Sequence, residues 1–300
     1  MRNYKKQREE YRQLKKGYFH LSTDGWKDGK LFNSTNQFAY GMWLIGLATL
    51  LFPVVIYDFV LMPNHIHILL SGTGEAAVNV FLYLKRKINA RLMQDGFAPL
   101  PEDYGFKLVP IEDKEQMRAN FLYVDRNPYE KQLSAPGGYP WGCGYGVFSL
   151  LPDLIGGRKV ESMTARNRKA LTRSTVILPD NWEYHPVLGL LPKSFVDTRL
   201  FYKMFAAPKD YLTRLVKDYE TFVGLARSLD ENMVFDEKEL EEIVSRELNG
   251  RPLSQLDAEN KGRLAVTLYK KYECPPEMIA KTIRIPLHLV NQFLRAKDYR

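Results

Sequence analysis

The sequence predicts an α+β protein, with an antiparallel sheet and packed helices followed by a mostly helical C-terminal region. Three observations support this fold class. The first half of the chain alternates strand-like and helix-like segments in the order β-α-β-β-α-β-α. From Asp210 onward the apolar residues follow a helical pattern. The composition, 45% hydrophobic and 26% charged, is that of an ordinary globular chain.

Each element of the first half has its own local signal. We predict strands over residues 17–23, 54–61, 65–70 and 106–111, and helices over residues 35–52, 75–94 and 114–124. Pro63 and Asn64 are turn residues that join the second and third strands. Ser34 or Thr35 caps the first helix. The next helix has apolar positions near a period of 3.6 and a basic flank.

Residues 31–57 contain no charged side chain, so they have to be weighed as a membrane span. A span needs roughly 20 apolar residues in one helix. Here a polar stretch, residues 33–37, begins the segment, and Pro53 interrupts it. We therefore predict a buried helix that leads into a buried strand, and no membrane association. The basic N-terminus is followed by no apolar signal core, which argues against secretion.

The charge balance favours a polyanionic partner. Lys and Arg outnumber Asp and Glu by 43 to 35, a net charge of +8. Such a surplus favours nucleic acid before membrane. The two cysteines, Cys143 and Cys274, cannot form a disulfide framework and cannot hold a structural zinc ion by themselves. We therefore expect a cytoplasmic protein and assign the cysteines no role.

Changes in composition divide the chain into three predicted parts. Residues 17–150 hold the alternating elements, residues 151–209 a basic linker or extension, and residues 210–300 a helical domain. In the helical part we predict helices over residues 211–228, 236–249, 260–272, 276–283 and 286–296.

Two histidines form the most informative pair. His65 and His67 lie two apart on a predicted strand, so their side chains point to the same face of the sheet. Two imidazoles on one face are natural ligands for a divalent ion. The alternative is two histidines on a half-solvated strand that form hydrogen bonds and nothing more.

A tyrosine and an asparagine form a second pair. Tyr123 and Asn127 are four residues apart, so they share a face if the helix that begins at Lys114 continues to residue 127. Pro128 biases Asn127 away from helical geometry. A tyrosine is a long, rigid arm that can form a covalent phosphodiester. The alternative is that Tyr123, one of eighteen tyrosines, is a packing residue.

These residues resemble a known family. The string FVLMPNHIHIL at residues 59–69, followed by YVDRNP at residues 123–128, is similar to the single-tyrosine HUH transposases. Within them it looks most like the REP-associated tyrosine transposases. The resemblance covers roughly residues 17–145, including Tyr139-Pro140-Trp141. The short members of that branch end near this point, whereas this chain continues with a C-terminal helical extension.

The resemblance implies a fold and a chemistry. It implies a ferredoxin-like HUH palm, in which His65, His67 and Asn127 hold a divalent metal ion, Mg²⁺ or Mn²⁺. Tyr123 would be the nucleophile, and single-stranded or hairpin DNA would be cleaved and rejoined through a 5′-phosphotyrosine intermediate. The protein would be nucleoid-associated, and a monomer or a homodimer. We expect Lys85, Lys87 and Arg91 on the basic helix flank to contact the DNA backbone, the alternative being a solvated flank.

Two other functions stay open. One is a domesticated protein that binds DNA repeats or hairpins without turnover. The other is a replication-initiator type of nicking enzyme, or a metal-dependent phosphodiesterase, with the same site geometry.

The last predicted helix, residues 286–296, offers an independent signal for duplex DNA. Its polar side chains share one face at the spacing i, i+3, i+4, i+7: His288, Asn291, Gln292 and Arg295. A short helix that presents these residues after a tight turn resembles a helix-turn-helix reader of the major groove. The alternative is an ordinary three-helix bundle with a polar outer face.

Overall fold

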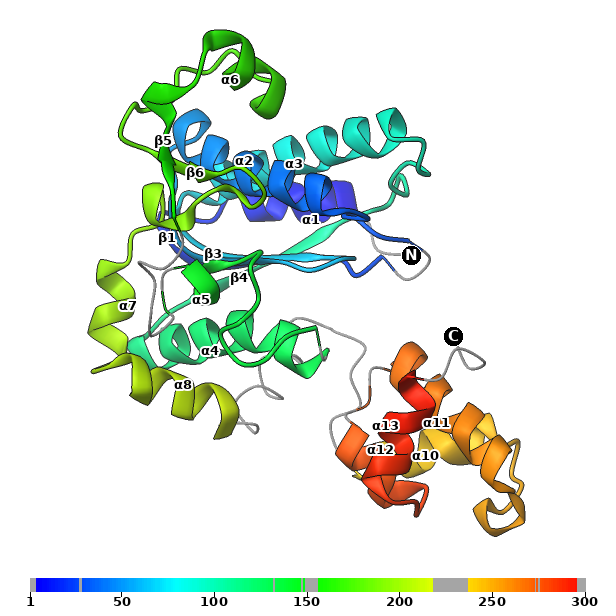
Figure 1. Cartoon of the computed structure of the whole chain (residues 1–300). Coiled ribbons are helices and arrows are strands. Elements are labelled where there is room, and N and C mark those ends of the chain that lie inside the picture. Colours follow the sequence, from blue (N-terminus) through cyan, green and yellow to red (C-terminus); the bar gives the residue numbers. More distant parts are fainter. Residues whose placement is uncertain are drawn as a thin grey trace. The chain divides into compact units, whose positions relative to one another are not determined.

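The computed structural model describes residues 4–26, 29–131, 133–146, 148, 156–217, 237–272, 274 and 276–295. The chain divides into two compact units, Met1–Leu225 and Ala226–Arg300. The first holds a sheet with helices on both of its sides, and the second is helical (Figure 1). The predicted α+β class is therefore confirmed. The three-part division of the chain stays a prediction.

A four-stranded antiparallel sheet forms the centre of the first unit. Its strands are β1 (Gly17–Thr23), β2 (Val55–Leu61), β3 (Ile66–Gly72) and β4 (Phe106–Ile111), in the order β2-β3-β1-β4. β1 pairs with β3 so that Ser22 lies opposite His67 and His20 lies opposite Leu69. Because residues directly opposite each other share a face, His20 and His67 belong to the same side of the sheet.

Helices cover both sides of this sheet. Figure 1 shows α1 (Tyr4–Arg12), α2 (Thr35–Leu51) and α3 (Gly74–Gln94) on one side, and α4 (Lys114–Glu130), α5 (Cys143–Gly146) and α8 (Pro208–Lys217) on the other. α7 (Arg199–Met204) also packs against α4. The core between the layers is apolar, with Leu21, Ile68 and Leu70 fully buried.

The apolar helix α2 is an interior element. Its N-terminus is capped by Ser34, whose hydroxyl accepts a hydrogen bond from the backbone N–H of Gln37 at 3.3 Å. Most of its residues are buried on every side, as expected of a helix between a sheet and further elements. Among the described residues, no helix is long and apolar enough to cross a membrane.

The helix α4 departs from its predicted end. The sequence predicts a helix over residues 114–124 because Pro128 disfavours helical geometry at Asn127, but α4 continues through both residues to Glu130. Pro128 removes one backbone hydrogen bond. The side chain of Asn127 donates from Nδ2 to the carbonyl oxygen of Tyr123 at 2.9 Å. Both Asn127 and Pro128 are buried, so tertiary packing outweighs the local preference.

Residues 158–217 are part of the first unit. The elements of this region not yet described are β5 (Arg158–Lys159), η2 (Val160–Ser162), α6 (Ala165–Thr172), β6 (Glu183–His185), β7 (Gly189–Leu190) and η3 (Pro192–Ser194). The three strands form a small sheet in the order β5-β6-β7, and β7 lies against α2. The helix predicted over residues 211–228 is described as far as Lys217, and the rest lies outside the described residues.

The second unit is a helical bundle with its own apolar core. Its elements are α10 (Glu237–Glu247), η4 (Leu253–Gln255), α11 (Ala258–Tyr272), α12 (Pro276–Thr282) and α13 (Leu287–Arg295). Leu240, Leu268, Ile279 and Val290 are fully buried in this core. α13 packs against both α11 and α12.

Candidate active site

The sheet and α4 bring the predicted site residues together. His65 directly precedes β3 and His67 lies on it, and their ring centroids are 4.7 Å apart. Tyr123 and Asn127 lie one turn apart on α4, as their spacing predicts. The ring of Tyr123 meets that of His67 edge-on at 5.4 Å. The Asn127 side chain donates from Nδ2 to the Tyr123 carbonyl oxygen at 2.9 Å.

His20 also lies in this site, although no motif in the sequence marks it. Its Nε2 lies 3.0 Å from Nδ1 of His67, and its Nδ1 lies 2.6 Å from Oδ1 of Asn120 on α4. The His20 ring also meets Tyr123 edge-on at 5.6 Å. Alternation along β1 places His20 on one face of the sheet, but it does not predict that β1 lies beside β3. That neighbour is known only from the strand order of the folded sheet.

The site is buried. His65 is 7% exposed, His67 0%, Tyr123 1% and Asn127 2%. Burial lowers the pKa of His20 to about 4, and burial together with the neighbouring His65 and His20 lowers the pKa of His67 well below its ordinary value. Both imidazoles are therefore neutral at neutral pH, which is the protonation state that binds metal ions.

The residues of the site fit a divalent metal ion by their donor chemistry. Two imidazoles and an amide oxygen are a donor set for a first-row divalent ion such as Mn²⁺, and a less favourable one for Mg²⁺. The Nδ1 atom of His65 lies 2.8 Å from Oδ1 of Asn64. The rings of His65 and His67 are therefore both held by a hydrogen bond at Nδ1. Within the described residues, no group of three or more His, Cys, Asp or Glu side chains is placed to hold a metal ion. His65, His67 and Asn127 remain the candidate ligands that the sequence resemblance implies.

A buried acidic cluster lies on the same side of the sheet. Asp58 on β2 and Asp125 on α4 are 0% and 7% exposed. Tyr211 of α8 donates to Oδ2 of Asp125 at 2.5 Å, and the backbone N–H of Gly144 donates to Oδ1 at 3.2 Å. Burial raises the pKa of Asp125 to about 7, and burial followed by the Asp125 charge raises the pKa of Asp58 well above its ordinary value. The cluster joins α4 to α8 and to α5.

The predicted DNA contacts on α3 have unequal surroundings. Lys85 donates from Nζ to the carbonyl oxygens of Glu102 and Tyr104, at 2.9 and 2.7 Å. Arg91 pairs with Asp95 at 2.6 Å. Lys87 makes no ion pair with a described residue. Lys85 and Arg91 are thus held by the protein itself, and Lys87 is the better placed of the three to meet a ligand.

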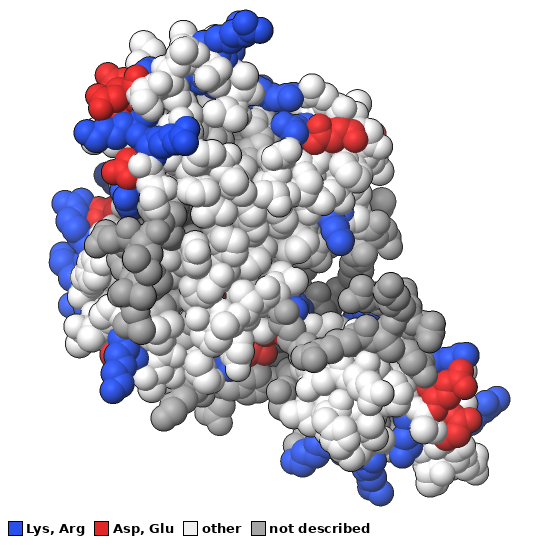
Figure 2. All heavy atoms as spheres, in the orientation of Figure 1, with Lys and Arg blue, Asp and Glu red and all other residues white. Residues whose placement is uncertain are grey.

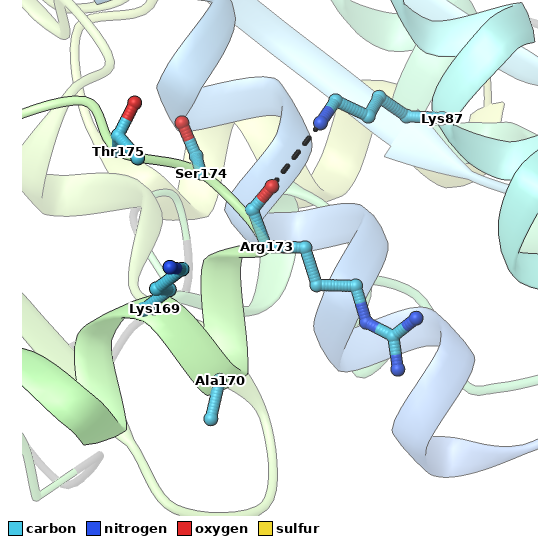
Figure 3. Close-up of a pocket in the computed structure, with 6 residues that line it drawn as sticks. All are labelled: Lys87, Lys169, Ala170, Arg173, Ser174 and Thr175. Atoms are coloured by element: carbon cyan, nitrogen blue, oxygen red, sulfur yellow. Dashed lines mark hydrogen bonds between the residues drawn. The ribbon is translucent and has the colours of Figure 1, made fainter.

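Lys87 lines a basic cavity of about 690 Å³ between α3 and the end of α6. It donates from Nζ to the carbonyl oxygen of Arg173 at 3.2 Å (Figure 3). The other lining residues are Lys169, Ala170, Arg173, Ser174 and Thr175. Arg173 ends α6 with a left-handed backbone, φ 49°, which is uncommon for a residue other than glycine. Figure 2 shows that Lys and Arg side chains are spread over the first unit at several places on that face, rather than gathered in one stripe.

The C-terminal helices have the spacing of a helix-turn-helix motif. α12 ends at Thr282 and α13 begins at Leu287, and Arg284 in the turn between them has φ 55°. A turn of this length is usual in the motif. On α13, His288 and Gln292 are exposed and Val290 is buried, as the predicted two-sided pattern requires. Asn291 is half-buried, and Arg295 is the last residue of the helix.

No protein-family model and no curated protein matches the sequence. Among solved structures, the chain is similar to a REP-associated tyrosine transposase bound to a REP hairpin. The two are 15% identical over 43% of this chain and 78% of that chain, with a TM-score of 0.36. This likeness is distant and partial.

Proposed function

We propose that this protein is a metal-dependent enzyme that cleaves and rejoins single-stranded DNA through a covalent bond to Tyr123. The substrate class is a single strand or a hairpin, and the reaction class is that of a tyrosine transposase or strand transferase. The proposal rests on residues of this chain, namely the histidine strand, the tyrosine helix and their spacing in the sequence.

The observation that carries the proposal is the position of Tyr123 against His67. The two residues are 56 positions apart in the sequence, and β3 and α4 bring their rings together in a T-shaped contact with centroids 5.4 Å apart. Asn127 lies on the same face of α4, one turn after Tyr123. A nucleophile and candidate metal ligands thus share one site, as phosphodiester cleavage requires.

The chemistry balances without a nucleotide cofactor. The phenol oxygen of Tyr123 bonds to the phosphorus and the bond from phosphorus to the 3′ oxygen breaks. The phenol gives up its proton and the departing 3′ oxygen gains one. His65, His67 and Asn127 would hold a divalent ion, which when bound polarises the phosphate and stabilises the charge on its oxygens. Attack by a 3′ hydroxyl on the phosphotyrosine reverses these changes and rejoins the strand.

The buried site implies that α4 moves when substrate binds. Tyr123 is 1% exposed and His67 is 0% exposed, so a phosphate group cannot lie between them in this arrangement. Two of the hydrogen bonds that hold α4 come from the region after residue 156: Arg118 donates to the Met204 carbonyl at 3.1 Å, and Tyr211 donates to Asp125. We therefore propose that the described arrangement is a closed state.

The cavity at Lys87 suits a flanking phosphate rather than the scissile one. α3 and α4 lie on opposite sides of the sheet (Figure 1), so a strand held at Tyr123 would reach Lys87 only around the edge of the sheet. Lys169 and Arg173 add positive charge there, and Ser174 and Thr175 add hydroxyl groups. In this proposal Lys87 contributes affinity and takes no part in the chemistry.

The test is formation of a covalent complex. The full-length protein is incubated with labelled single-stranded hairpin DNA and Mn²⁺ and then run on a denaturing gel. We expect a protein–DNA band that resists denaturation for wild type and for Tyr129→Phe, a control in the same helix. We expect no band for Tyr123→Phe or for the double variant His65→Ala, His67→Ala. A band that persists in Tyr123→Phe would contradict the choice of nucleophile.

A second candidate function is supported by the burial of Tyr123. A protein that binds hairpins or repeats without turnover would not need the site to open. It would shift the same DNA on a native gel but give no covalent band across a range of hairpins and with either Mn²⁺ or Mg²⁺. That pair of results would replace the proposed enzyme by the binding protein.

A further inference from the structure

The side chain of Asn120 has a fixed orientation beside His20. Its Nδ2 donates to the carbonyl oxygen of Gln116, one turn earlier in α4, at 2.8 Å. Its Oδ1 therefore faces Nδ1 of His20, at 2.6 Å. Because an amide oxygen can only accept, His20 has its proton on Nδ1.

The same reasoning continues from His20 to His67. His20 is 1% exposed and its polar and aromatic contacts are Asn120, His67 and Tyr123, none of which is a negative partner for an imidazolium. A neutral His20 protonated at Nδ1 has a lone pair at Nε2, which faces Nδ1 of His67 at 3.0 Å. His67 must then donate from Nδ1, and its own lone pair lies at Nε2.

His65 reaches the same tautomer through a different partner. Its Nδ1 lies 2.8 Å from the side-chain oxygen of Asn64, which also accepts. The two histidines of the candidate metal site therefore present the same ring nitrogen, Nε2, as the ligand atom. Hydrogen bonds from the outer nitrogen of a metal-binding histidine commonly fix the tautomer and orient the ring in this way.

We propose that His20, held by Asn120, is a positioning residue that fixes His67 as the Nδ1-protonated tautomer and so directs its Nε2 lone pair toward the metal ion. The inference rests on the proposed function for the presence of the metal, and on the hydrogen bonds alone for the tautomer. A histidine that only filled space between the sheet and α4 would place no constraint on the His67 tautomer.

The primary test is a tautomer measurement on the full-length, metal-free protein. Long-range ¹H–¹⁵N correlation spectra distinguish the two neutral tautomers of each histidine, and the protein has five histidines. Substitution of each in turn assigns the signals. We expect His67 and His20 both to be protonated at Nδ1. A His67 protonated at Nε2 in wild type would overturn the proposal, and this result does not depend on any variant of His20.

The second test measures metal affinity in paired variants. His20→Phe keeps an aromatic ring beside Tyr123 but cannot accept from His67, whereas His20→Gln places an amide oxygen near the position of Nε2. We expect His20→Phe to bind Mn²⁺ about 10–100-fold more weakly by titration calorimetry, and His20→Gln to recover part of that loss. His185→Gln, at a site with local backbone contacts in the small sheet, is the control and should bind as wild type.

The outcomes separate this proposal from the proposed function. Equal Mn²⁺ affinity in wild type and in a folded His20→Phe would overturn the role of His20, even if DNA adducts still form. The expected tautomers and affinities without any DNA adduct would support the positioning role and overturn the enzymatic proposal. If His20→Phe does not fold, His20→Gln takes its place in the test. A His20→Gln protein with the Mn²⁺ affinity of wild type, but with His67 not protonated at Nδ1, would overturn the positioning role.

Discussion

At Asp125, burial and hydrogen bonding shift the pKa of the carboxyl group in opposite directions. The pKa of this carboxyl is raised from its ordinary value of 3.8 to about 7, chiefly by burial, while the hydroxyl of Tyr211 and the N–H of Gly144 act in the opposite direction. The nearby Asp58 has a pKa raised in the same sense. The folded protein therefore holds protons in this cluster that the unfolded chain has already released at neutral pH.

This cluster predicts how stability depends on pH. Below about pH 4, Asp125 is protonated in the folded and in the unfolded state, and its burial costs least. This contribution to stability is lost as the pH rises through about 7, the pKa of Asp125 in the folded protein. Each proton contributes a slope of at most about 1.4 kcal/mol per pH unit. We expect the free energy of unfolding of the first unit to fall between about pH 4 and pH 7, and Asp125→Asn to reduce that fall, as measured by urea denaturation.

A matched variant separates this effect from general surface charge. Asp180 is an acid on the same unit with a side chain 71% exposed, and Asp180→Asn should leave the pH dependence of wild type unchanged. An Asp125→Asn protein with the full wild-type slope would contradict the assignment of that slope to the buried cluster.

At the scale of elements, α4 is the part of the site that other helices hold in place. Phe121 on its inner surface meets Phe148, Phe201 and Phe205 edge-on, and the rings of Phe148 and Phe201 stack at 3.7 Å. The hydroxyl of Tyr211 joins this aromatic cluster to Asp125. The region after residue 156 therefore stabilises the position of the tyrosine helix.

Loss of the Tyr211 hydroxyl should loosen α4. Tyr211→Phe keeps the ring in the aromatic cluster and removes a hydrogen bond to a buried carboxyl group, at a cost of about 1–3 kcal/mol. We expect faster amide hydrogen exchange in residues 114–130 by mass spectrometry and, because the site opens more often, a higher yield of covalent adduct. Tyr202→Phe on α7, where the side chain is 59% exposed, is the control. Unchanged exchange in α4 would contradict the role given to this contact.

At the scale of the whole molecule, the chain carries two separate candidate DNA-binding elements. The first unit holds the tyrosine site, and the second presents α13 after a tight turn. We propose that the second unit binds a duplex flank, so that its surface residues contribute to affinity and not to cleavage. The net charge of +8 is consistent with a polyanionic partner for the chain.

Substitution on α13 should separate these two activities. Gln292 is exposed, so Gln292→Ala is expected to weaken binding of a duplex that contains the recognised sequence by about 1–3 kcal/mol and to leave adduct formation on a minimal hairpin unchanged. Fluorescence anisotropy at fixed salt measures the affinity. Gln255→Ala, at an exposed position in η4 of the same unit, is the control. Equal losses of duplex affinity in both variants would contradict recognition of the DNA sequence by α13.

The elements with strong local signals could be predicted from the sequence. The strands at residues 17–23 and 106–111 lie where the pattern places them, and Ser34 caps α2 as one of the two expected residues. The end of α4 could not be predicted, because the local effect of Pro128 opposes a helix that only tertiary packing sustains.

The candidate site also contains some residues that the sequence predicts and others that only the folded structure reveals. His65, His67 and Tyr123 could be found from a motif and its spacing. His20 could not, because its role depends on β1 lying beside β3, and strand order is a property of the folded sheet. The buried pair of Asp58 and Asp125 is likewise formed by residues 67 positions apart, and neither position carries a local signal.

The most direct measurement of the central claim is identification of the residue that carries DNA in the covalent complex. Trypsin cleaves after Arg118, Arg126 and Lys131, so Tyr123 lies in the peptide 119–126 and Tyr129 lies in the peptide 127–131. We predict that mass spectrometry of the digested, nuclease-trimmed complex finds the nucleotide on peptide 119–126. A nucleotide on peptide 127–131, or the absence of any covalent peptide from a protein that binds hairpin DNA and Mn²⁺, would contradict the account.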